Sequence, residues 1–171
     1  MNYKINFEVN EKFYNEKLKN NPKDFESIFK LSVLYLQTQR FNLAKSILNK
    51  GIKIYPNHAG LQNNLGVTFE KLGELKKATI YFEKAIEINP NFAHAYYNLG
   101  KVFYSLNELK KEIKNFEKSI KILPNNADAY NNLGATLKEL GENKKAINCY
   151  ESAIKIDPNY INAYNNLGTI L

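Results

Sequence analysis

The sequence predicts an all-α fold, a solenoid of stacked antiparallel helix pairs, and the repetition of one short unit is the main reason. Prolines recur every 34 residues, at Pro22, Pro56, Pro90, Pro124 and Pro158. Apolar residues in both halves of each interval follow the spacing of an amphipathic helix. Chains below roughly 40 residues rarely bury a sufficient core alone, so the copies are expected to stabilise one another by stacking.

Four complete units and one partial unit fill most of the chain, at residues 25–58, 59–92, 93–126, 127–160 and 161–171. In the first half of each unit a leucine precedes a small residue: Leu31-Ser32, Leu65-Gly66, Leu99-Gly100, Leu133-Gly134 and Leu167-Gly168. In the second half, a set such as Ala78, Phe82 and Ala85 falls on one helical face. Each complete unit is therefore predicted to contain two helices.

The turns inside the units carry residues that tolerate a left-handed backbone. Gly73 and Gly141 are suited to end the first helix of their units, and Asn107 can adopt the same conformation at modest cost. Gln39 stands at the equivalent position of the first unit and is a poor substitute. Between units, proline disfavours helix in the residue before it, and the asparagine that follows, such as Asn91, is predicted to cap the next helix.

The two ends of the chain differ from the complete units. Residues 1–24 form a separate N-terminal segment, in which apolar residues alternate like a strand between residues 3 and 9. Phe13, Tyr14 and Leu18 fit a helix instead, and we expect a helix over about 9–20 that caps the stack. At the other end, residues 161–171 hold a first helix without a second, so we expect the protein to continue beyond Leu171.

One column of the second helices contains an exception. It reads Ala44, Ala78, Glu112 and Ala146, and its small residues allow two helices to approach closely. A buried, unpaired carboxylate would cost several kcal/mol. Glu112 is therefore predicted to reach solvent beside Lys111 or Lys114, with local loosening of its helix pair.

Composition and charge argue against several classes of partner. The formal net charge is +7, yet Arg40 is the one arginine among 24 basic residues, and arginine is favoured for bidentate phosphate and base recognition. No apolar run is long enough for a membrane helix, and the N-terminus does not sustain the apolar core of a signal peptide. We therefore predict no nucleic-acid or membrane partner and a cytoplasmic location.

No residues suggest chemistry. Cys149 stands alone, so an intramolecular disulfide is impossible, and a packing or surface role is expected for it. His58 and His94 have no third ligand at useful spacing, and zinc, phosphate-loop and redox motifs are missing from the sequence. The sequence therefore predicts no catalytic residue, no metal site and no cofactor.

The repeated unit resembles the tetratricopeptide repeat, over residues 25 to 171. The resemblance rests on the 34-residue period, on the Tyr-x-x-Leu-Gly starts at 96–100, 130–134 and 164–168, on Ala78, Phe82 and Ala85, and on the closing proline. Tyrosine replaces the tryptophan of the family pattern. The resemblance implies a right-handed α-solenoid whose first helices line a concave groove.

Two neighbouring columns of the first helices supply the candidate binding residues. They comprise Asn63, Asn64, Tyr97, Asn98, Lys101, Asn131, Asn132, Asn165 and Asn166. Their asparagines resemble the peptide-binding ladder of the O-linked N-acetylglucosamine transferase repeats. A primary amide both donates and accepts, so it can pair with any peptide backbone. Helices about 8–10 Å apart would place one amide at about every third residue of an extended peptide. Alternatively, asparagine is simply abundant in this chain and solvated at these positions.

The predicted function is a noncatalytic scaffold that holds an extended segment of a protein partner. One alternative is the substrate-recruiting front part of a longer enzyme, such as a glycosyltransferase, and another is an assembly platform that uses the outer face. A third is a basic clamp for a terminal carboxylate, for which Lys30, Lys101 and Lys138 are candidates. That clamp is incomplete, because asparagines and Asp128 occupy places where basic residues would be needed. The identity of the partner and the oligomeric state stay open.

Overall fold

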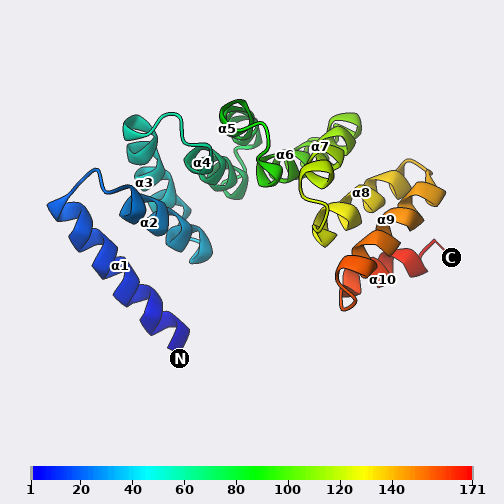
Figure 1. Ribbon diagram of the computed structural model, residues 1–171, viewed down its shortest axis with the longest axis horizontal. Helices are drawn as coiled ribbons and strands as arrows, with labels where there is room; N and C mark the ends of the chain where they lie inside the picture. Colours follow the sequence, from blue (N-terminus) through cyan, green and yellow to red (C-terminus); the bar gives the residue numbers. More distant parts are fainter. Residues whose placement is uncertain (1, 171) are drawn as a thin grey trace. The chain divides into compact units, whose positions relative to one another are not determined.

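The computed structural model describes residues 2–170, and these residues form α-helices joined by short turns (Figure 1). The helices are grouped in two compact units, one ending at Pro90 and the other beginning at Asn91. Within each unit, consecutive helices pack as antiparallel pairs. The predicted all-α architecture of stacked helix pairs is therefore confirmed.

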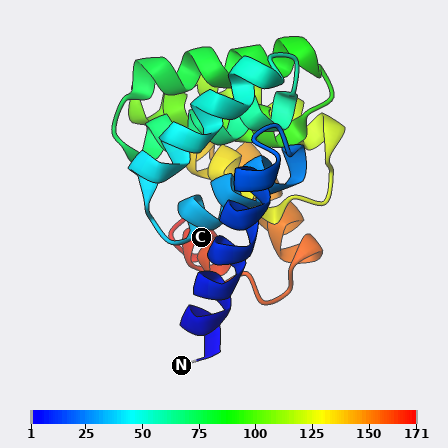
Figure 2. The same cartoon turned by 90° about the vertical axis from the view of Figure 1, so that its left-hand side faces the viewer.

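The first unit contains α1 to α5. Their bounds are α1 Asn2–Asn20, α2 Phe25–Gln37, α3 Phe41–Ile54, α4 Ala59–Lys71 and α5 Leu75–Ile88. Helices α2 and α3 form one pair and α4 and α5 the next, while α3 packs against α4. Helix α1 packs against α2 (Figure 2).

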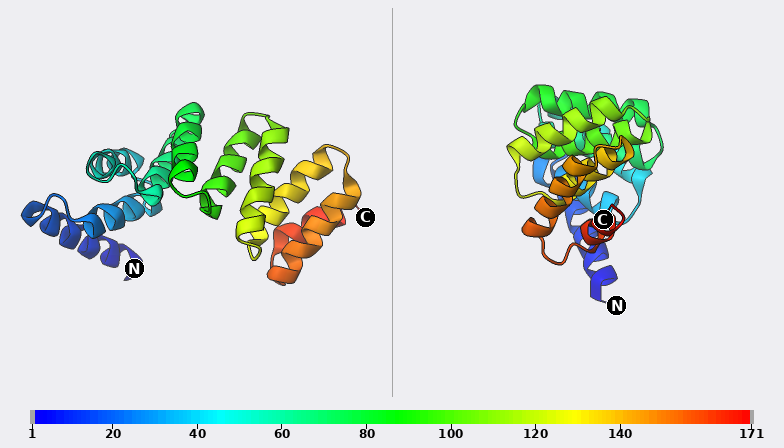
Figure 3. Two further views of the ribbon diagram at one scale, coloured as in Figure 1. Left: turned by 45° about the horizontal axis from the view of Figure 1, so that its top comes forward. Right: turned by 90° about the vertical axis from the view of Figure 1, so that its right-hand side faces the viewer.

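The second unit repeats this plan with α6 to α10. Their bounds are α6 Ala93–Ser105, α7 Leu109–Ile122, α8 Ala127–Glu139, α9 Asn143–Ile156 and α10 Ile161–Gly168. Helix α6 pairs with α7 and α8 with α9, α7 packs against α8, and α10 packs against α9 (Figure 3). No helix among the described residues is long and apolar enough to cross a membrane.

Glycines in the first helices allow an aromatic ring to lie directly on the helix backbone. A Cβ atom added to Gly66 would lie 2.7 Å from the ring of Phe82. The same distance separates a Cβ at Gly134 from the ring of Tyr150. Because each ring is held in a close-packed core, it cannot easily move aside. The leucine-glycine pair of the sequence therefore marks the contact between the two helices of a pair.

All four turns within the helix pairs use a left-handed residue. Gly73 and Gly141 have φ values of 75° and 77°, and Asn107 has 58°. Gln39 adopts the same conformation with φ 57°, although its side chain makes this conformation unfavourable. The predicted turn positions are correct, and the turn of the first repeat, between α2 and α3, is strained at Gln39.

The capping residues differ from the prediction by one position. Asp24, His58 and Asn126 stand two residues after a proline, and each accepts a hydrogen bond from a backbone N–H in the first turn of the next helix. Asn91 directly follows its proline, and the N-cap of α6 is the next residue, Phe92, whose side chain makes no capping bond. The prediction that the asparagine after proline caps each helix is wrong for Asn91.

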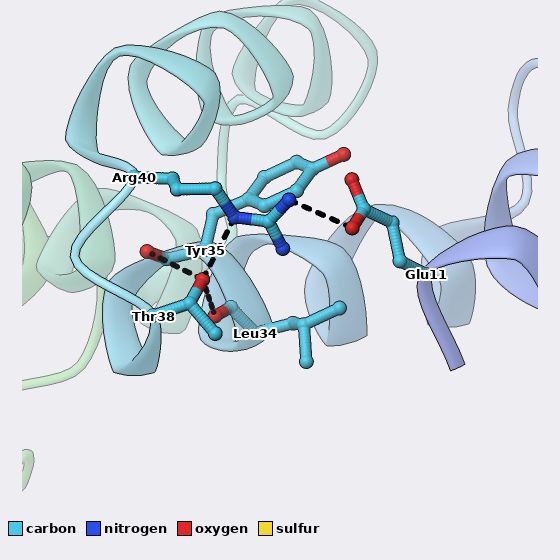
Figure 4. A network of polar contacts seen from close by, with 5 residues as sticks. All are labelled: Glu11, Leu34, Tyr35, Thr38 and Arg40. Carbon is cyan, nitrogen blue, oxygen red and sulfur yellow. Dashed lines mark hydrogen bonds and ion pairs between the residues drawn. The ribbon is translucent and has the colours of Figure 1, made fainter. Parts of the chain in front are cut away.

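Helix α1 begins at Asn2, earlier than the predicted start near residue 9, so the alternation between residues 3 and 9 does not mark a strand. Extending an existing helix costs less than nucleating a new element, which favours the longer helix. Figure 4 shows how α1 is attached: Glu11 Oε2 pairs with Arg40 Nη1 at 2.7 Å. Arg40 also donates from Nε to Thr38 Oγ1 at 3.0 Å, and its guanidinium lies 4.8 Å from the centre of the Tyr35 ring.

Glu112 does not reach solvent, and the prediction that it lies beside Lys111 or Lys114 is wrong. Its exposed fraction is 1%, because its position on α7 faces α8. Oε1 is hydrogen-bonded to Oγ1 of Thr136, and Oε2 has no partner among the described residues. Burial raises the pKa of Glu112 to about 7, against the opposing effect of the Thr136 bond, and the charge of Glu139 raises it further.

Candidate functional site

The predicted binding residues lie on the first helix of each pair, where neighbouring first helices touch. Helix α2 contacts α4 in the first unit, and α8 contacts α10 in the second. We call the predicted binding residues on these first helices, together with Ser32, the amide faces. That of the first unit consists of Ser32, Asn63 and Asn64, and that of the second consists of Tyr97, Asn98, Lys101, Asn131, Asn132, Asn165 and Asn166.

In the second unit, hydrogen bonds link the amide of one repeat to the preceding repeat. Asn166 Nδ2 donates to Asn131 Oδ1 at 2.9 Å, and Asn132 Nδ2 donates to the hydroxyl of Tyr97 at 3.2 Å. Both bonds span 35 residues, so the same relation recurs in successive repeats. Asn131 Nδ2 also lies 3.5 Å from Asn132 Oδ1, which joins the two columns within α8.

The first unit contains a variant of this arrangement. Position 29 holds a phenylalanine, which has no acceptor in its side chain, and Asn64 Nδ2 instead lies 3.4 Å from Oγ of Ser32, one turn further along α2. Asn63 Nδ2 lies 3.5 Å from Asn64 Oδ1, as in the equivalent pair of α8. Ser32 was not predicted as a contributor, because a small residue in the glycine column was interpreted only as packing.

The two asparagine columns differ in exposure. Asn63 and Asn131 are buried, with exposed fractions of 8% and 7%. Asn64, Asn132 and Asn166 of the neighbouring column are half-buried. Tyr97 of the first column is half-buried and Asn165 is exposed, so burial is not shared by the whole column. Where the first column is buried, at Asn63 and Asn131, it supports the half-buried amides of the second column.

Two threonines behind the amide faces were not singled out from the sequence. Thr68 Oγ1 donates to the backbone oxygen of Asn64 at 2.8 Å, and Thr136 Oγ1 lies 3.1 Å from the backbone oxygen of Asn132. Both hydroxyls are fully buried. They stand two full repeats apart, so the period of the sequence does indicate that their positions are equivalent.

Charged residues near the second amide face are engaged with neighbours. Lys138 Nζ donates to Thr169 Oγ1, and Asp128 accepts from the hydroxyl of Tyr160. Burial and the Asp128 carboxylate raise the pKa of Tyr160, which keeps that hydroxyl protonated. Lys101 Nζ lies 5.7 Å from the centre of the Tyr97 ring. The face thus offers mainly neutral donors and acceptors.

Features typical of enzymes do not gather at the amide faces. Two open pockets, of about 370 Å³ at Gly141–Lys145 and about 250 Å³ beside Gln39 and Leu72, lie at turns. Within residues 2–170, no group of three or more His, Cys, Asp or Glu side chains is placed to hold a metal ion. Burial raises the pKa of Cys149 to about 11, so this thiol is a poor nucleophile at neutral pH.

Comparison with protein families agrees with this architecture. The family described as "Tetratricopeptide repeat" matches residues 25–58, 59–92 and 81–114 in three related forms, and the family described as "TPR repeat" matches 100–141 and 136–171. Together the matches run from residue 25 to residue 171. The chain belongs to the tetratricopeptide-repeat family, a class of helical repeat proteins that form interaction scaffolds.

Solved structures of the same fold include several repeat proteins. A crystal structure of MamA is 28% identical, with a TM-score of 0.80 and coverage of 92% of both chains. YrrB, titled "a TPR protein with an unusual peptide-binding site", is 23% identical, with a TM-score of 0.74 and coverage of 96% of this chain and 84% of YrrB. The thermophilic TPR protein TTC0263 of Thermus thermophilus is 18% identical, with a TM-score of 0.80 and coverage of 98% and 92%. The comparison with curated proteins gave no match.

Proposed function

We propose that this protein is a noncatalytic scaffold that binds an extended segment of a protein partner along its amide faces. The observation that carries the proposal is the recurring hydrogen bond from the half-buried amide of one repeat to the neighbouring column of the preceding repeat. This bond fixes the orientation of Asn132 and Asn166 before any ligand arrives. A fixed amide loses little side-chain entropy on binding, which favours affinity.

The bonding capacity of these amides supports a peptide ligand. A primary amide has two N–H groups and an oxygen with two lone pairs. The bond to the preceding repeat uses one N–H of Asn132 and one of Asn166. The remaining groups match the alternating C=O and N–H of an extended backbone, so recognition would depend little on the side chains of the peptide.

Comparisons add only general support to this proposal. YrrB is described as having a peptide-binding site, but at 23% identity the likeness concerns the fold alone. We also propose that the asparagines bind peptide in the manner of the O-linked N-acetylglucosamine transferase ladder. A cytoplasmic location is proposed as well. A role in recruiting substrate to an enzyme would use the same amide faces, so the binding experiment applies to both.

The experiment replaces the half-buried amides of the second column and measures peptide affinity. Peptides are first selected on the unmodified protein from a displayed library of random, unstructured sequences. Replacing both Asn132 and Asn166 by alanine is expected to weaken binding by about 30-fold, because each lost hydrogen bond contributes about 1 kcal/mol. Fluorescence polarisation of a labelled peptide measures the change.

A matched control separates the amide face from a general effect of removing asparagine. Asn125 lies in a turn and Asn148 on α9, and both are exposed. Their double replacement by alanine is expected to leave the affinity within about twofold, as is usual for surface changes away from a site. Unchanged affinity in the Asn132 and Asn166 variant, with its helical circular dichroism intact, would refute binding by the amide faces.

A further inference from the structure

Glu112 lies directly behind the second amide face and is connected to it by one side chain. Its carboxyl group is buried between α7 and α8, and the equivalent position of the other complete repeats holds alanine. Oε1 contacts the hydroxyl of Thr136, which also lies 3.1 Å from the backbone oxygen of Asn132. The carboxyl group, the hydroxyl and the ladder asparagine therefore form a continuous chain of contacts.

The contacts between Glu112, Thr136 and Asn132 have enough donor hydrogens only when the carboxyl group of Glu112 is neutral. The hydroxyl of Thr136 has one hydrogen but faces two acceptors, the Asn132 carbonyl oxygen and Glu112 Oε1. An ionised Glu112 would compete for that hydrogen and leave a second charged oxygen, Oε2, buried without a partner. A neutral Glu112 donates to Thr136 Oγ1, and Thr136 then donates to Asn132. The neutral form satisfies both contacts.

We propose that Glu112 is a proton-operated latch, whose neutral carboxyl group holds α7 against α8 and whose ionisation loosens that contact and the amide face above it. Only the last step, the effect on the amide face as a binding surface, rests on the proposed function. Loss of the proton places a charge in a site that offers one hydroxyl as its partner. The carboxylate then gains solvation by leaving, and the helices must separate to release it.

The charges around Glu112 favour the neutral form. Helices α6 and α8 both pack against α7. From α8, the carboxylate of Glu139 opposes ionisation. Helix α6 carries His94, which is exposed, and Lys101, whose ammonium lies over the Tyr97 ring. On its own helix, Lys111 is exposed and pairs with Glu108, and Lys114 is exposed. Among the described residues, the charge that acts on the pKa of Glu112 is thus the carboxylate of Glu139, which disfavours ionisation.

The direction of the pH effect follows from the proton balance. The pKa of Glu112 rises from the ordinary 4.5 to about 7 on folding, so between these values the folded state holds a proton that the open state releases. Opening is therefore favoured as pH rises from 4.5, and the effect saturates above 7. Between about pH 5 and about pH 8 the expected change in the opening equilibrium is roughly 70-fold.

Two measurements on the full chain test the latch without any ligand. Carbon-13 NMR of labelled glutamate carboxyl groups should show one titration near pH 7, missing from the Glu112→Gln variant. Amide hydrogen exchange, corrected for intrinsic rates, should show protection of α7 and α8 falling by roughly 70-fold between about pH 5 and about pH 8 in the unmodified protein but not in Glu112→Gln. Titration of Glu112 with the ordinary glutamates, or an equal loss in Glu112→Gln, would overturn the latch.

Matched variants keep the test decisive. Glu117 is an exposed glutamate on the same helix, and Glu117→Gln should retain the full pH effect. If Glu112→Gln does not fold, Glu112→Ala replaces it, because alanine occupies this column in the other units. Affinity for a peptide selected at pH 5 should fall at pH 8 in the unmodified protein and persist in the variant. Loss of protection with unchanged affinity refutes the last step, whereas failure of any peptide to bind refutes only the proposed function.

Discussion

At the scale of single residues, the hydroxyl group of Tyr150 is a local cost to stability. Tyr150 is fully buried against Gly134, and its oxygen has no hydrogen-bond partner among the described residues. Burial raises its pKa, so the group stays neutral. Phe82 and Phe116 occupy the same column in the two preceding repeats, and their rings likewise pack against a glycine of the first helix. A phenylalanine would therefore fit this site.

The variant Tyr150→Phe is expected to be more stable than the unmodified protein by about 1 kcal/mol, because it removes a buried polar group that lacks a partner. Urea unfolding followed by circular dichroism measures the difference. Tyr164→Phe is the control, since Tyr164 is exposed and its hydroxyl is solvated, and it should change stability little. A loss of stability in Tyr150→Phe would mean that the hydroxyl group has a partner in solution.

Adjacent residues of the amide faces show what a single sequence can and cannot indicate. Asn131 and Asn132 were predicted together, since both repeat with the period of the units. One is buried and the other half-buried, because the next first helix covers only one of the two columns. Periodicity identifies positions that are equivalent, but burial depends on a neighbour about one repeat away. The sequence therefore located the amide face, but it did not indicate which asparagine is buried and which one can reach a ligand.

Glu112 was also recognised from the sequence as an exception, but its environment was not. Removing a carboxylate from water is costly, so an exit to solvent was the expected solution. The structure instead buries the group, which raises its pKa to about 7, and provides Thr136, which belongs to the following repeat. A partner 24 residues away on another helix cannot be read from local spacing. The position of the anomaly was predictable, and its chemistry was not.

At the scale of elements, the turn between α2 and α3 is strained at Gln39. Its φ of 57° is left-handed, a conformation that glycine adopts in the equivalent turns at Gly73 and Gly141. For a side chain other than glycine, this conformation costs roughly 1–2 kcal/mol. Gln39 is exposed, so little packing is lost when its side chain is removed.

Replacing Gln39 by glycine is expected to raise the stability of the first unit by about 1 kcal/mol, less than the full strain because glycine also gains freedom in the unfolded chain. Hydrogen exchange of α2 and α3 reports the change locally. Asn107→Gly should give a smaller gain, since asparagine tolerates the left-handed region better than glutamine does. Equal or lower protection in Gln39→Gly would show that its side chain makes a compensating contact.

Most helices were predictable from the sequence because each combines an amphipathic pattern with turn residues at both ends. The start of α1 was not, since residues before position 9 carry no such boundary. The attachment of α1 was hidden as well, because it depends on Glu11 and Arg40, which are 29 residues apart. Whether this helix acts as a cap for the repeats remains a prediction.

At the scale of the whole molecule, the positive charge and the proposed binding surface are carried by different helices. The chain carries a formal charge of +7, and its basic residues are almost all lysines. Pairs such as Lys76-Lys77 and Lys144-Lys145 are exposed on the second helices. The amide faces lie on the first helices and consist mainly of neutral groups. Attraction to polyanions and recognition of a peptide are therefore separable by salt.

Binding of a selected, uncharged peptide should change by less than about twofold between about 50 and about 300 mM NaCl, because contacts between neutral groups are not screened by salt. Binding of a polyanion such as heparin to the lysines should weaken by more than about tenfold over this range, since it depends on released counterions. Fluorescence polarisation of labelled peptide and labelled heparin measures both. Lys76→Ala with Lys77→Ala should weaken only heparin binding. A steep loss of peptide affinity with salt would show that lysines, and not the amides of Asn132 and Asn166, hold the peptide.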